Sequence, residues 1–272
     1  MAIESKGNAE YAFTMTVHGF YAGLVSKTNA ELFSAPEPDL GGSLLYVGEL
    51  DGDGRALVVA SNIAGAASLC AAADPVAQKR ALRDGVIDFL VNSLDEALRI
   101  LKNEIRKREA VSVCVALAPE TLECEMLERG VLPDLLRPSA DSKAHDDAHR
   151  RHFASLTETN PMAETALVVW RVDSAPTQWL PRLDAIALDC LEADAGPARR
   201  WLRLGPRYLG RMAQGVRLLV SDREFCAKFI GRVRAAVEAG EIAVPVEIRA
   251  TFKGGIAELH FAPKDATRAD QA

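Results

Sequence analysis

The chain has 272 residues, of which 49% are apolar and 26% charged, the balance of a globular protein rather than of a disordered one. The net charge of −6 argues against a dedicated nucleic-acid binder, and no apolar run is long enough to span a membrane. Residues 1–10 lack the apolar core of a secretion signal, so we expect a cytoplasmic protein without a membrane partner.

The first elements follow from apolar runs and turn residues. A helix over 14–33 precedes a turn cluster at 39–42 and a strand over 43–50. The DGDGR segment at 51–55 has two interpretations: a β-hairpin turn, or a loop leading into a helix over 55–67. We favour the helix because strands and helices alternate regularly after it. One face of that helix would carry Ala56, Val59, Ile63 and Ala67.

From residue 68 the sequence alternates between strands and helices. Asp74 and Pro75 predict a helix start, since Asp caps helices and Pro suits their first turn. The capping box from Ser93 to Glu96 predicts another. Strands are expected over 68–73, 86–91, 111–117 and 132–138, and helices over 75–85, 94–109 and 119–130. This alternation predicts a parallel sheet wound by crossover helices.

The second half is less regular. A strand over 166–173 and a helix over 177–193 precede a basic stretch at 199–217, and the capping box at Ser221–Glu224 opens a helix that ends near Gly240. The last segments, 244–252 and 256–261, predict a hairpin or two strands.

We therefore predict an α/β fold, with a Rossmann-like parallel sheet and crossover helices plus a smaller α/β region. The expected organisation is a helical N-terminal segment (1–38), a Rossmann-like domain (39–140), a connector with a histidine cluster (141–163), the smaller α/β region (164–263) and a tail (264–272).

Several segments, in order, resemble the urocanase (urocanate hydratase) family. They are VHG at 17–19, DLGG at 39–42, LRDGVIDFLVNSLDEAL at 82–98, MLERGVLPDLL at 126–136, AHD at 144–146 and the stretch at 199–248. The resemblance implies a Rossmann-like core that holds NAD, whose nicotinamide helps to add water to urocanate, and it implies a homodimer. This chain is much shorter than a urocanase.

The resemblance places the NAD phosphate loop at 49–55, where Gly52 falls on a family glycine. Glu49, Asp51 and Asp53 put three carboxylates where the pyrophosphate would lie, which argues against NAD; Arg55 could offset one of them. The candidate cofactor-binding residues are Gly52, Gly54, Asp74 and His18.

Other family residues are missing. The ribose-binding acid falls on Ala72, with Asp74 as the nearest substitute, and a glycine–asparagine contact falls on Leu117 and Ala118. The catalytic cysteine falls near Met162. The substrate-holding arginine–aspartate–histidine run falls on Ala250, Thr251 and Phe252, next to Arg249.

Three histidines form a second candidate site. His145, His149 and His152 have i, i+4 and i+7 spacing, so on a helix they would share a face that can bind a metal. His145 and Asp146 are also the candidate catalytic groups, with Asp147 as a further acid/base or metal-linked group. The alternative is a solvated helix start.

Two further groups of residues have structural interpretations. The stretch at 199–217 has six arginines with Trp201 and Tyr208 interleaved, and an amphipathic surface is favoured over an anion or nucleic-acid site. The five cysteines have no metal-binding spacing and are expected as reduced thiols.

Two functional interpretations remain open. The first is a urocanase-like protein that lacks urocanate hydratase activity and has a small-molecule-binding or protein-interaction role. The alternative is a divergent lyase or hydrolase whose active site is the crevice implied by the urocanase resemblance, assisted by NAD or a metal.

Overall fold

The structure is a computed structural model that describes residues 2–27, 39–137, 165–253 and 255–263. The chain divides into two compact units. The parallel-sheet unit comprises residues 16–159, and the antiparallel-sheet unit comprises residues 1–15 and 160–272. Helix α1 (Ala2–Lys27) contributes to both.

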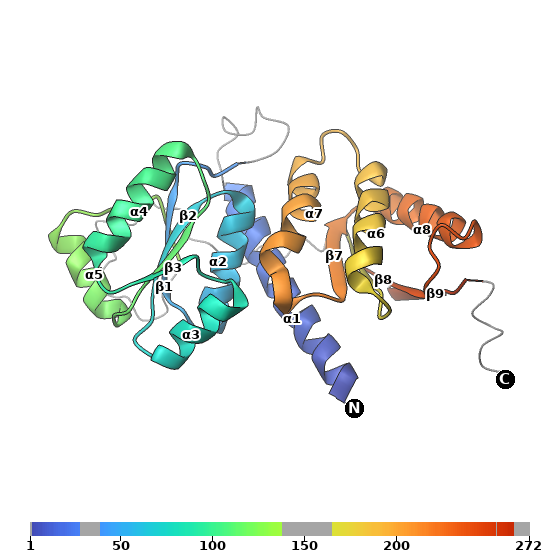
Figure 1. The fold of residues 1–272 in the computed structure, drawn as a ribbon. Coiled ribbons are helices and arrows are strands. Elements are labelled where there is room, and N and C mark those ends of the chain that lie inside the picture. Colours follow the sequence, from blue (N-terminus) through green and yellow to red (C-terminus); the bar gives the residue numbers. More distant parts are fainter. Residues whose placement is uncertain (1, 28–38, 138–164, 254, 264–272) are drawn as a thin grey trace. The chain divides into compact units, whose positions relative to one another are not determined.

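A five-stranded parallel sheet forms the centre of the parallel-sheet unit (Figure 1). Its order is β3-β4-β2-β1-β5, and every pair of neighbours is parallel. The strands are β1 (Leu44–Glu49), β2 (Ala67–Ala71), β3 (Phe89–Val91), β4 (Ser112–Val115) and β5 (Leu135–Leu136). The helices are α2 (Gly52–Ala64), α3 (Pro75–Asp84), α4 (Leu94–Lys107) and α5 (Pro119–Glu128). The predicted Rossmann-like α/β fold is confirmed.

The two faces of this sheet are covered by different helices. Helices α4 and α5 pack on one face, and α2 and α3 lie on the other (Figure 1). The residues of β2 and β4 are buried on both faces, as expected for central strands of a parallel sheet. Their apolar runs therefore reflect two-sided burial, and Cys70 and Cys114 are fully buried members of them.

Helix ends follow the predicted caps with one correction. The Asp74 carboxylate accepts hydrogen bonds from the N–H groups of Val76 and Ala77 at 2.9 and 3.2 Å, and the Ser93 hydroxyl accepts one from the Glu96 N–H at 3.3 Å. At α8 (Arg223–Glu238) the capping residue is Asp222 instead of Ser221.

Some predicted boundaries were wrong. Helix α1 begins well before residue 14, because the weak helix formers near its start obscured the pattern. Helix α2 ends before Gly65, which has a left-handed conformation (φ 96°), so Ala67 lies in β2 and not on a helix face. Only the second half of 86–91 is a strand, because the Val86 N–H bonds back to Ala81 at the end of α3.

The antiparallel-sheet unit contains four strands in the order β7-β6-β8-β9 (Figure 1). The strands are β6 (Ala166–Arg171), β7 (Val216–Ser221), β8 (Val246–Phe252) and β9 (Gly255–Phe261). The helices are α6 (Pro176–Cys190), α7 (Gly196–Leu209) and α8, with a 3₁₀ turn at Gly210–Met212. Trp170 of β6 is fully buried and packs against Phe229 of α8. No described helix has the length and apolar character needed to cross a lipid bilayer.

Candidate functional site

The candidate site lies at the carboxyl end of β1, where the chain passes through the acidic loop (residues 49–55) into α2. Strand β1 has β2 on one side and β5 on the other. After β1 the sheet is extended on the β2 side, and the last strand, β5, is then added on the other side of β1. The order of the strands therefore reverses at β1. Ligands of open α/β sheets bind in the crevice at such a reversal, outside the carboxyl ends of the strands.

The Asp51 carboxylate caps the N-terminus of α2. Its Oδ1 accepts a hydrogen bond from the Gly54 N–H at 2.6 Å, and the Arg55 N–H donates to the Asp51 carbonyl oxygen at 3.0 Å. The N-terminus of a helix attracts anions because its N–H groups are unpaired and the helix dipole is positive there. In this chain the anion at that position is the protein's own carboxylate.

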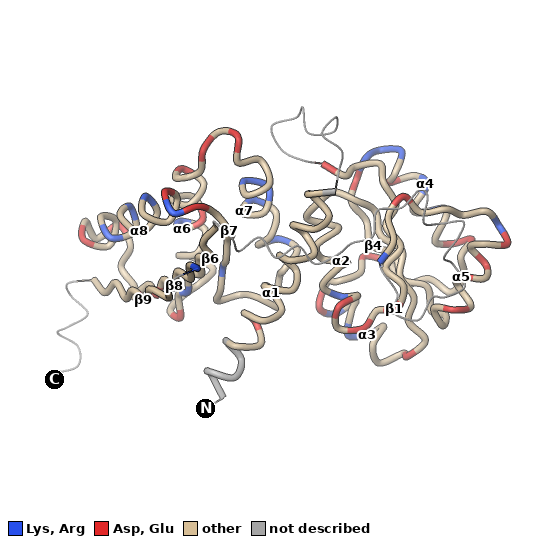
Figure 2. Tube along the Cα trace, turned by 180° about the vertical axis from the view of Figure 1, so that it is seen from behind, with Lys and Arg blue, Asp and Glu red and all other residues tan. Residues whose placement is uncertain are grey.

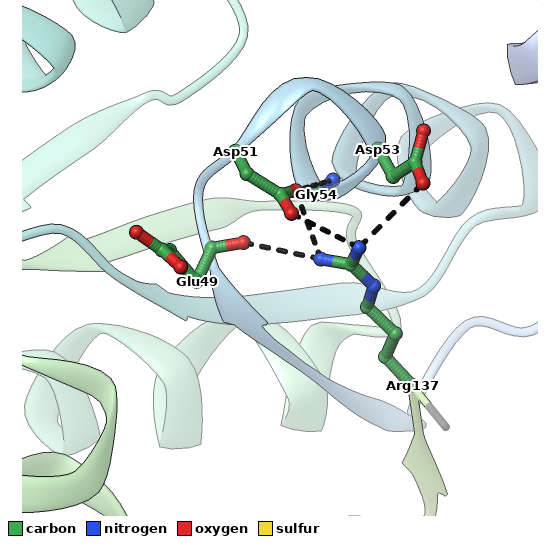
Figure 3. A network of polar contacts seen from close by, with 5 residues as sticks. All are labelled: Glu49, Asp51, Asp53, Gly54 and Arg137. Atoms are coloured by element: carbon green, nitrogen blue, oxygen red, sulfur yellow. Dashed lines mark hydrogen bonds and ion pairs between the residues drawn. The ribbon is translucent and has the colours of Figure 1, made fainter. Parts of the chain in front are cut away.

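Arg137, the residue after β5, holds this carboxylate from the other side (Figure 3). Its Nη1 and Nη2 donate to Asp51 Oδ1 and Oδ2 at 2.9 and 3.2 Å, a bidentate pair. Nη2 also lies 3.8 Å from Asp53 Oδ2. Nη1 donates to the Glu49 carbonyl oxygen at 3.4 Å, while the Glu49 carboxylate points away (Figure 3).

The charges of the acidic loop are therefore partly neutralised within the unit. Partial burial acts to raise the pKa of the Asp51 carboxyl, but the hydrogen bonds from Arg137 and from the Gly54 N–H outweigh it and hold the pKa below its usual value. Asp51 remains charged and fixed between the helix N-terminus and a guanidinium group.

The expected partner of the loop, Arg55, has a different role. Its Nη2 lies 2.7 Å from Asp84 Oδ2, and both side chains are largely buried. Sequence reasoning missed Arg137 because it lies 86 residues from Asp51. Its only signal was its place near the carboxyl end of the last predicted strand (132–138), at the edge of the sheet where carboxyl ends meet.

Gly52 and Gly54 both lie in the first turn of α2, but only Gly54 is sterically required. A Cβ atom on Gly54 would lie 2.1 Å from the Glu49 carbonyl oxygen, whereas a Cβ atom on Gly52 would have nothing within 4 Å. The Gly54 position therefore lets α2 start in contact with the end of β1. Close packing of helix on strand is one of the roles of glycine in dinucleotide-binding loops.

No uncommitted carboxylate lies at the described residues where the resemblance places the ribose-binding acid of the family. Ala72 follows β2 and is buried, and both carboxylate oxygens of Asp74 are used to cap α3. Together with the carboxylates of the acidic loop, these residues do not fit a dinucleotide: Asp51 takes the place where a phosphate would meet the helix, and the usual ribose contact is absent from this stretch.

His18 lies on α1 and is buried, with only 8% of its surface exposed. Its ring is tilted against that of Tyr21, with 6.4 Å between the ring centroids. Burial lowers its pKa to about 4, because the charged imidazolium loses its hydration. At neutral pH His18 is thus an uncharged part of the parallel-sheet unit.

We predict that His18 makes stability depend on pH. The unfolded chain binds a proton near pH 6.5 and the folded chain only near pH 4, so the free energy of unfolding should fall by about 3 kcal/mol as the pH falls through this window. Urea denaturation followed by circular dichroism at several pH values measures it. His18→Gln should remove this part of the pH dependence, and His260→Gln, at an exposed site on β9, should keep it. Identical pH profiles for the wild type and His18→Gln would contradict the prediction.

The histidine cluster lies outside the described residues. His145, Asp146, Asp147, His149 and His152 are in this segment, as is Met162. The metal and catalytic hypotheses for them stay predictions. Among the described residues, no three His, Cys, Asp or Glu side chains are grouped so that they could hold a metal ion.

The basic stretch at 199–217 covers most of α7 and the first two residues of β7 (Figure 2). Neither element was predicted. Arg199 donates to the carbonyl oxygens of Leu191 and Glu192, and Arg217 pairs with Asp184 at 3.1 Å. Trp201 is buried and donates to the Leu218 carbonyl oxygen at 2.7 Å. These three side chains therefore hold the unit together.

Comparison with known proteins identifies a family domain and similar proteins. The sequence profile of the Urocanase Rossmann-like domain matches residues 16–159, more than half of the chain and the same residues as the parallel-sheet unit. A protein named S-methyl thiourocanate hydratase, from a Variovorax species, is 36% identical over 95 residues. That match covers 34% of this chain and only 17% of the relative's length.

Proposed function

Because this chain belongs to the urocanase family, we propose that it is a urocanase-like protein without urocanate hydratase activity, whose Rossmann-like domain does not hold NAD as the family does. The observation that carries the proposal is the Asp51 carboxylate, which caps α2 and is fixed by Arg137. A dinucleotide phosphate would have to displace both contacts.

Electrostatics support the same conclusion. A pyrophosphate would come close to the Asp51 and Asp53 carboxylates, and each like-charge contact at about 4 Å costs on the order of 1 kcal/mol or more, depending on solvation. Arg137 offsets part of this repulsion, but its guanidinium group already serves the same two carboxylates. The carboxyl end of β1 is therefore a poor phosphate site, which supports a role for this domain in binding a different small molecule or in protein contacts.

The test is direct. We expect the purified protein to release no NAD on denaturation and to leave the ultraviolet absorbance of urocanate unchanged, with or without added NAD. A urocanate hydratase assayed in parallel is the positive control. Stoichiometric NAD in the purified protein, or turnover of urocanate, would contradict the proposal.

A second candidate function is a divergent lyase of the same family. The name of the Variovorax relative favours it, since that protein is a hydratase of S-methyl thiourocanate. The same assay with S-methyl thiourocanate as the substrate separates the two candidates. Loss of that substrate with urocanate left intact would favour the lyase, and loss of neither would favour the protein without hydratase activity.

A further inference from the structure

A small pocket in the antiparallel-sheet unit has no part in the proposed function. Its volume is about 70 Å³. One buried water needs about 10–15 Å³ of such space, so the pocket has room for several waters or one small polar group. It is lined by Asn8 and Tyr11 of α1, Val169 and Arg171 of β6, and Glu247 and Arg249 of β8.

The register of the sheet places both arginines on the same face. Strands β6 and β8 are antiparallel, with Val169 opposite Arg249 and Arg171 opposite Glu247. Side chains alternate along a strand, so Trp170 and Ile248 point to the other face, where both are fully buried. Two guanidinium groups from adjacent strands therefore line one pocket.

The charges around the pocket favour an anion. Arg249 pairs with Glu258 of β9 at 2.7 Å, but both side chains are about half exposed (47% and 48%), so water weakens this pair. The lining itself carries two permanent positive charges against the single carboxylate of Glu247. A metal cation would be repelled, and an apolar group would leave the polar lining without hydrogen bonds.

We propose that this pocket binds the carboxylate group of a small organic acid. A carboxylate is planar and accepts two parallel hydrogen bonds from a guanidinium group, which matches Arg171 and Arg249. The Tyr11 hydroxyl and the Asn8 amide supply further donors. Glu247 is placed to accept a hydrogen bond from a hydroxyl or ammonium group of the same acid.

The probe for this site is acetate, titrated into the full chain by calorimetry at constant ionic strength. Saturable binding of one acetate in the millimolar range is expected. Arg171→Gln should weaken it at least 10-fold, because a charged hydrogen-bond donor is lost. Arg232→Gln removes an exposed charge from α8 of the same unit, away from the pocket, and should leave the affinity unchanged.

A milder variant covers the case in which Arg171→Gln does not fold. Tyr11→Phe removes one hydroxyl group and should weaken acetate binding by about 2- to 10-fold. Acetate binding that does not saturate, or equal weakening by Arg232→Gln, would overturn the proposal. Inorganic phosphate is the second probe, and a more than 10-fold preference for phosphate over acetate would also overturn it.

Discussion

Replacing Gly54 with alanine should lower the free energy of unfolding by about 3 kcal/mol, as overpacking of a closed site does. The new Cβ atom would lie 2.1 Å from the Glu49 carbonyl oxygen and 3.2 Å from its carbon. Both are backbone atoms, so neither can move aside by changing a rotamer. Strand β1 and helix α2 would have to separate, and the Asp51 cap would be strained with them.

Gly52→Ala is the matched control, because it adds the same methyl group two residues earlier, where nothing lies within 4 Å. Gly52→Ala should change the free energy of unfolding by no more than about 0.5 kcal/mol. Urea denaturation followed by far-ultraviolet circular dichroism measures both variants. All three tryptophans (170, 179 and 201) lie in the antiparallel-sheet unit. Their fluorescence therefore reports the unfolding of the unit that neither substitution touches, which serves as an internal reference. Equal stability of the two variants would show that the contact with Glu49 is easily relieved.

Replacing Asp184 with leucine should destabilise the antiparallel-sheet unit by about 3–5 kcal/mol. Asp184 is 7% exposed and accepts hydrogen bonds from Trp170 Nε1 at 3.2 Å and Arg217 Nε at 3.1 Å. Burial raises the pKa of its carboxyl even though both partners favour the charged form. Without the carboxylate, the Arg217 guanidinium would be left largely buried without its counter-charge.

Asp189→Leu on the same helix is the control. Asp189 is 69% exposed and lies 3.9 Å from Arg232, so its loss should cost no more than about 1 kcal/mol. Denaturation followed by tryptophan fluorescence measures both, since Trp170 contacts Asp184 directly. A double variant, Asp184→Leu with Arg217→Met, should recover part of the loss because it leaves no buried charge. A double variant that is less stable than Asp184→Leu alone would contradict this explanation.

The fold of the parallel-sheet unit could be predicted because its signals are local. Apolar runs mark β1, β2 and β4, and the side chains of Asp74 and Ser93 cap the helices they precede. The regular alternation of these elements then implies the parallel sheet. The glycine loop was also placed correctly as the start of a helix.

The candidate site could be predicted only in part, because its decisive contact is not local. The sequence shows the carboxylates of the acidic loop, but whether Arg55 or Arg137 neutralises them depends on the pairing of β5 with β1, which is only two residues long. The basic stretch was difficult for a related reason. Arginine is usually a surface residue, so the sequence gives no sign that Arg217 is buried. Only its tertiary contact with Asp184 explains the burial.

The shared helix α1 also determines how the chain can be assembled and divided. Residues 1–15 belong with 160–272, so in sequence terms one unit is inserted into the other. During synthesis all of residues 16–159 are added to the chain before β6, the first described strand of the interrupted unit. The N-terminal turns of α1 therefore cannot pack against the antiparallel sheet until residues 160–272 have been made. An expression fragment limited to 16–159 would begin in the middle of a helix, without its natural first turns.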